Sequence, residues 1–89
     1  MAERSDEYII GRLIERSRLL IALSDEIPVE TKLQTQPLLK QLEQALSVPP
    51  AEQDEERVRG TYAALYGELV DYADLEALLS ALKNFVPYL

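Results

Sequence analysis

Residues 62–82 read YAALYGELVDYADLEALLSAL, and the spacing of the apolar residues in this stretch decides the fold. Helical periodicity places Tyr62, Leu65 and Leu69 on one side. A second stripe follows, formed by Leu75, Leu78, Leu79, Leu82, Phe85, Val86 and Leu89. On an uninterrupted helix this second stripe would point the opposite way, so one straight helix cannot bury both. We therefore predict a break at residues 72–74, with Asp74 capping a helix that folds back.

Prolines and acidic residues place the other predicted boundaries. Val48-Pro49-Pro50 stops one helix, and the acids that follow are typical of a helix start, because they compensate the macrodipole. Pro37 suits a first helical turn, and we expect residues 24–36 to form a loop with at most one turn near residues 28–33. The predicted helices span residues 6–23, 37–47, 52–71 and 74–86.

The helix predicted over residues 6–23 is apolar around more than half of its circumference. Ile9, Ile10, Leu13, Ile14, Leu20 and Ile21 share one broad face, which Tyr8, Leu19 and Leu23 extend. With four helices and no alternating strand pattern, the sequence predicts an all-α, antiparallel four-helix bundle that forms a single domain over residues 1–89. We expect the shared core to include Leu42, Leu65, Leu69, Leu79 and Leu82.

Composition argues against most catalytic chemistry. The 89 residues include no Cys and no His, which removes thiol nucleophiles, disulfides, the commonest metal ligand and the commonest general base. No phosphate-binding loop or nucleophile motif is present. Glu68, Asp71 and Asp74 could converge on a cation, but a solvated helix face explains them as well. We expect no enzyme activity, no cofactor and no metal.

Charge and hydropathy limit the partners and the location. The net charge is −7, and acids balance bases over residues 1–24, so the excess lies in residues 25–89. Such a surface repels phosphate backbones and anionic lipids, so we expect no direct nucleic-acid binding. The acidic start at residues 3–7 does not resemble a signal peptide, and no apolar run could span a membrane. We expect a cytoplasmic protein.

Three groups of residues are candidates for binding another protein. Arg12 and Arg16 lie one turn apart beside Tyr8, and Arg and Tyr are enriched at interfaces, although the arginines could equally pair with a neighbouring helix. Tyr66 and Val70 lie at the margin of an apolar face. The third group is the acidic segment, defined as Glu52, Asp54, Glu55 and Glu56, which could attract a basic partner or simply start a helix.

Small residues mark one further face of the helix predicted over residues 52–71. Gly60, Ala63, Ala64 and Gly67 lie on it, and each glycine costs about 1 kcal/mol relative to Ala inside a helix unless the space is used. This pattern predicts a close contact inside the bundle or, alternatively, a groove for a partner.

The leading functional hypothesis is a non-enzymatic acidic helical protein that binds and regulates or neutralises another protein, as an adaptor, inhibitor or immunity-type factor. Its partner could be basic. The alternative is an assembly subunit that forms a homodimer by exchanging its last two helices, because straightening the break at residues 72–74 would offer two opposed stripes to different chains.

Overall fold

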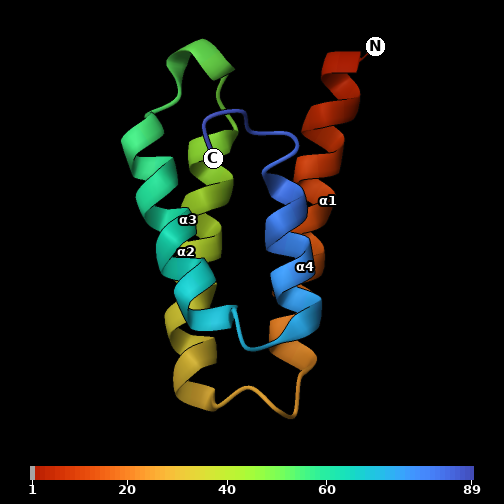
Figure 1. Cartoon of the computed structure of the whole chain (residues 1–89), viewed down its shortest axis with the longest axis vertical. Helices are drawn as coiled ribbons and strands as arrows, with labels where there is room; N and C mark the ends of the chain where they lie inside the picture. Colours follow the sequence, from red (N-terminus) through yellow and green to blue (C-terminus); the bar gives the residue numbers. More distant parts are fainter. Residues whose placement is uncertain (1) are drawn as a thin grey trace.

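The computed structural model describes the backbone of residues 2–89 and the side chains of residues 7–89. Within this part of the chain the structure is all-helical, as predicted, with helices α1 (Ala2–Leu23), α2 (Val29–Leu46), α3 (Glu55–Leu69) and α4 (Ala73–Leu82). A 3₁₀ turn, η1 (Pro50–Glu52), joins α2 to α3. Figure 1 shows consecutive helices running in opposite directions, with both ends of the chain at the same end of the bundle.

The helices pack as two closely contacting pairs, α1 with α4 and α2 with α3. The pairs face each other, and α1 lies on the far side of the bundle from α3 (Figure 1). The predicted core residues Leu42, Leu65, Leu69, Leu79 and Leu82 are all buried, joined by Ile14, Ile21, Leu39, Val58 and Leu75. The core therefore draws on all four helices.

The chain reverses between α3 and α4, which confirms the predicted break. Tyr72 adopts an extended conformation, its amide donates to the Leu69 carbonyl at 3.0 Å, and its carbonyl accepts from the Glu76 amide at 2.9 Å. Asp74 was wrongly expected to be the cap, because Tyr72 occupies that position and no side chain caps the helix. Asp74 lies in the first turn instead, where its charge favours the helix dipole.

The start of α2 differs most from the sequence-based prediction. The helix begins at Val29 rather than Pro37, so Pro37 lies inside it and residues 29–36 are helical. Pro28 stands just before the helix, and its carbonyl accepts from the Lys32 amide at 3.0 Å. The turn before Pro37 is held by Thr35, which is fully buried and donates its hydroxyl to the Thr31 carbonyl at 2.8 Å. Packing of this turn offsets the ~3 kcal/mol that an internal proline costs.

The end of α1 at Leu23 is as predicted, and the remaining boundaries shift by one to four residues. The backbone of α1 is already helical at Ala2, α3 spans Glu55–Leu69 rather than 52–71, and α4 ends at Leu82 rather than 86. At the start of α3 the reason is Asp54, which caps the helix by accepting from the Arg57 amide at 3.2 Å. After α4, the proline at position 87 disfavours the helical conformation for Val86, and the chain continues in turns.

Tyr62 is buried, and its hydroxyl donates to the Leu79 carbonyl. The expected packing of the first helix is wrong. Tyr8, Leu19 and Leu23 were assigned to the buried arc of the first helix, yet they are 65%, 45% and 78% exposed. In a four-helix bundle α1 contacts neighbours on one side only, so its second apolar side faces solvent.

Truncation of core leucines tests this packing. Leu65→Ala and Leu82→Ala should each lower the free energy of unfolding by about 2–5 kcal/mol, because each removes a fully buried side chain and leaves a cavity. Leu23→Ala is the matched control: the side chain is 78% exposed, so its loss should change stability by no more than about 0.5 kcal/mol. Urea denaturation followed by circular dichroism gives all three values, and near-wild-type stability of the two core variants would contradict the packing described.

Candidate protein-binding surfaces

The outer face of α1 carries the first group of predicted binding residues. Tyr8, Arg12 and Arg16 are all exposed and follow one another at four-residue spacing. The Arg12 guanidinium lies over the Tyr8 ring, with its carbon 5.8 Å from the ring centroid. Neither arginine forms an ion pair with any side chain of residues 7–89. We define the α1 outer face as Tyr8, Arg12, Glu15, Arg16, Leu19 and Leu23.

The α1 outer face is hollowed rather than flat. A shallow depression of about 450 Å³ is lined by Tyr8, Ile9, Arg12, Leu13, Glu15, Arg16 and Leu19. All of these residues belong to α1, so the depression lies between side chains of a single helix. This face therefore presents apolar surface and charge without help from the rest of the bundle.

The acidic segment serves partly to start α3. Asp54 caps the helix, Glu55 and Glu56 lie in its first turn, and Glu52 ends η1. Glu55 approaches Arg59 at 3.9 Å, an exposed pair that contributes little to stability. All four acidic side chains remain exposed, so the segment keeps its negative charge at the surface.

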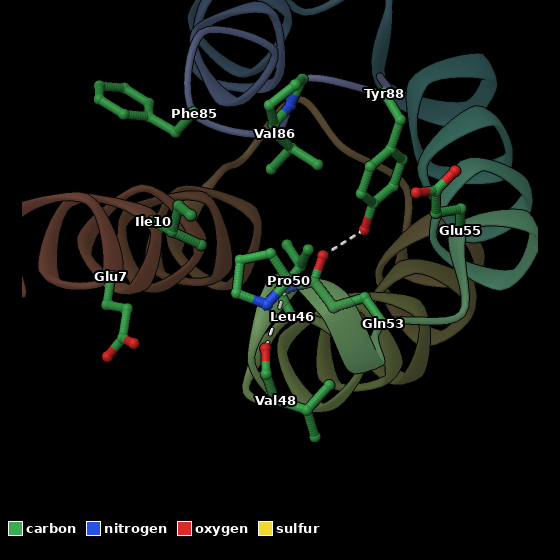
Figure 2. Close-up of a pocket in the computed structure, with 11 residues that line it drawn as sticks. Glu7, Ile10, Leu46, Val48, Pro50, Gln53, Glu55, Phe85, Val86 and Tyr88 are labelled. Carbon is green, nitrogen blue, oxygen red and sulfur yellow. Dashed lines mark hydrogen bonds between the residues drawn. The ribbon is translucent and has the colours of Figure 1, made fainter. Parts of the chain in front are cut away.

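A hollow opens next to the acidic segment, at the end of the bundle that holds both chain ends. It has a volume of about 550 Å³, and its lining residues, which define the end groove, are Glu7, Ile10, Leu46, Val48, Pro50, Gln53, Glu55, Phe85, Val86, Pro87 and Tyr88. Most of them are apolar. Figure 2 shows Glu7 and Glu55 on opposite sides of the groove, with Pro50 and Leu46 between them.

A chain of hydrogen bonds holds one wall of the end groove in place. The Tyr88 hydroxyl donates to the Gln53 side-chain oxygen, and the Gln53 side-chain nitrogen, Nε2, donates to the Val48 carbonyl at 3.0 Å (Figure 2). These bonds tie the last residues of the chain to the connection between α2 and α3. Burial, followed by the negative charge of Glu55, raises the pKa of Tyr88 above its ordinary value, so this hydroxyl stays a neutral donor.

Tyr66 and Val70 are the remaining predicted binding residues, and only Tyr66 forms side-chain hydrogen bonds within the chain. The Tyr66 hydroxyl donates to Glu76 Oε2 at 2.8 Å, and the Ser80 hydroxyl donates to the same oxygen at 2.8 Å. Tyr66 also stacks on Tyr62, with ring centroids 6.1 Å apart. Tyr66 thus links α3 to α4 within the chain. Val70 is 42% exposed at the α3–α4 reversal.

The small-residue face of α3 makes no close helix contact, so that interpretation was wrong. Gly60, Ala63, Ala64 and Gly67 are exposed, and a Cβ placed on either glycine would meet no atom within 4 Å. These positions therefore leave room for larger side chains without any rearrangement of the bundle.

The structure does not bring all the predicted binding residues together. The acidic segment borders the end groove, Tyr8, Arg12 and Arg16 lie on the α1 outer face, and Tyr66 and Val70 lie farther along α3. Sequence reasoning missed the contribution of residues 85–88 to the end groove. The signal in the sequence was the apolar run Phe85-Val86-Pro87-Tyr88 at the end of the last predicted helix.

Comparisons with protein-family models, with curated proteins and with solved structures find no match for this chain. None of the helices in the described part combines the length and hydrophobicity needed to cross a membrane. Among side chains 7–89 no cluster of three or more acidic residues is arranged to hold a metal ion. Function must therefore be argued from the two surfaces.

The Tyr66–Glu76 contact predicts a measurable pKa effect. Hydrogen bonds from Ser80 and Tyr66 lower the pKa of Glu76 below its ordinary value. A carboxylate with a lowered folded-state pKa stabilises the fold above its unfolded-state pKa, and this stabilisation is lost as pH falls through the folded-state value. Tyr66→Phe should raise the Glu76 pKa toward normal and weaken the acid-side dependence of stability. Carbon-detected NMR titration measures the pKa, and an unchanged value in Tyr66→Phe would contradict the assignment.

Proposed function

We propose that this chain is a non-enzymatic protein-binding module, and that the end groove is its binding site for a basic partner. The observation that carries the proposal is an apolar groove with carboxylates at both sides. Concave, mostly apolar hollows with a few polar groups are the usual form of binding sites. The groove accepts a segment with one or two apolar side chains next to lysine or arginine.

The charges around the groove support a basic occupant. Glu7 and Glu55 line the groove. The other members of the acidic segment, Glu52, Asp54 and Glu56, are sequence neighbours of Glu55 at the start of α3. With a net charge of −7, the protein attracts a cationic partner before contact and accelerates its encounter. The accessible apolar lining residues, led by Val48, Pro50 and Phe85, then supply the short-range contacts that keep the partner bound.

The same features support the other parts of the proposal. A chain without His or Cys is poorly equipped for acid–base or nucleophilic catalysis, whereas a regulator or immunity-type inhibitor needs only a complementary surface. The negative surface argues against direct contact with nucleic acids. A cysteine-free composition agrees with a cytoplasmic location.

A peptide titration tests the groove directly. A capped peptide of sequence Lys-Leu-Leu-Lys should shift the backbone NMR signals of Val48, Gln53 and Tyr88, and Glu-Leu-Leu-Glu should not. Val48→Arg should reduce binding at least tenfold, because it puts a long cation into the groove at a residue that is 38% exposed and outside the core. Glu68→Gln, on the small-residue face of α3, is a control that should bind normally. Shifts spread evenly over the acidic surface would contradict a defined site.

Charge neutralisation separates attraction from contact. Glu52→Gln, Asp54→Asn, Glu55→Gln and Glu56→Gln together should slow association of the same lysine peptide several-fold and change dissociation little. Asparagine is chosen at position 54 because it preserves the cap on the Arg57 amide. Wild-type association should slow similarly in 0.5 M salt, where the Debye length is roughly 4 Å. Stopped-flow fluorescence measures both rates, and association indifferent to salt and to these substitutions would exclude electrostatic capture.

A further inference from the structure

A second apolar seam runs along α1 on the side that faces solvent. The buried side presents Ile10, Ile14, Ser17 and Ile21. On the opposite side, Tyr8, Arg12, Glu15, Leu19 and Ala22 recur at alternating spacings of four and three, and all are exposed. This spacing is the heptad pattern by which one helix packs on another. Apart from Ala22, the seam lies within the α1 outer face.

Two large apolar side chains flank a charged pair in this seam. Tyr8 and Leu19, which are 65% and 45% exposed, stand on either side of Arg12 and Glu15. The depression of about 450 Å³ occupies the same stretch. A solvent-facing side of a bundle helix is normally polar throughout. Its apolar ends and hollow centre fit the side chains of another helix.

The order of the charges determines which helix fits. In a parallel pairing of two α1 helices, Arg12 would face Arg12 and Glu15 would face Glu15, which is repulsive. In an antiparallel pairing centred between Leu13 and Ile14, Arg12 of each copy faces Glu15 of the other. In the same alignment, Tyr8 of each copy packs against Leu19 of the other. The seam is therefore complementary to itself in one orientation only.

We infer that the α1 outer face binds a second copy of this chain through an antiparallel, two-fold α1–α1 contact held in register by two reciprocal Arg12–Glu15 ion pairs. Both charged groups are already positioned for it. The Tyr8 ring holds the Arg12 guanidinium, and Arg18 orients the Glu15 carboxylate by donating to both of its oxygens, from Nε to Oε1 at 3.2 Å and from the guanidinium Nη2 to Oε2. Glu15 can accept from a second arginine, because a carboxylate offers about four acceptor sites.

The contact leaves the rest of the molecule unchanged. Glu7 and Ile10, the residues through which α1 lines the end groove, lie off the seam, so both copies keep an open groove. The inference does not depend on what the groove binds. It also differs from exchange of α3 and α4 between chains, since each copy retains the fold described above.

Charge-swap variants of the full chain test the inference by sedimentation equilibrium. The wild type should dimerise as concentration rises toward the millimolar range. Arg12→Glu and Glu15→Arg should each weaken the dimer at least tenfold, because each sets like charges against one another at two places. Arg57→Glu, the same charge change on α3, should leave dimerisation within about twofold of wild type.

Rescue distinguishes the proposed geometry from mere damage to the fold. Mixing the Arg12→Glu and Glu15→Arg chains should restore dimers, because opposite charges then meet at both places. The double variant Arg12→Glu with Glu15→Arg should dimerise alone, which only an antiparallel pairing allows. A wild-type chain that stays monomeric at millimolar concentration would overturn the inference. So would dimers that persist in both single variants, or a double variant that remains monomeric.

Discussion

The reversal of the chain between Leu69 and Ala73 is the constraint on which the rest of the structure depends. It lets Leu65 and Leu69 on α3 meet Leu79 and Leu82 on α4 in one core, all at or near full burial. Two polar contacts then fix how the two helices sit: the Tyr62 hydroxyl donates to the Leu79 carbonyl, and the Tyr66 hydroxyl donates to Glu76. With α4 held in this way, residues 85–88 reach the end of the bundle and complete the end groove.

The fold could be predicted from opposed apolar stripes, but local signals misled at particular residues. Pro37 was read as a helix start, because a proline in a helix interior is costly, and the buried Thr35 that secures the preceding turn is recognisable only in three dimensions. Asp74 was read as a cap by residue type, although the backbone conformation of Tyr72 decides where α4 begins. Hydrophobic periodicity indicates which residues must be buried, whereas the residues at which a helix begins and ends depend on individual contacts.

The candidate surfaces were predictable in part for a related reason. The exposed Arg12 beside Tyr8 and the exposed acidic segment follow from sequence pattern and charge. The end groove does not, because its lining comes from three parts of the chain that only the fold brings together: α1, the α2–α3 connection and residues 85–88. The apolar residues of α1 were interpreted as one broad face that Tyr8, Leu19 and Leu23 extend, whereas the structure divides them between a buried side and a solvent-facing side. What the sequence could not say is that the chain itself covers only one of them.

Charge distribution connects the two surfaces. A net charge of −7 opposes contact between two copies almost everywhere, but the excess acid lies in residues 25–89. Over α1 the acids and the bases balance, so this helix contributes none of the excess negative charge, and the proposed contact between two copies uses the least acidic part of the chain. The acidic segment lies across the bundle from α1 (Figure 1). One distribution of charge is thus consistent with both proposals, self-association through the α1 outer face and attraction of a basic partner to the end groove.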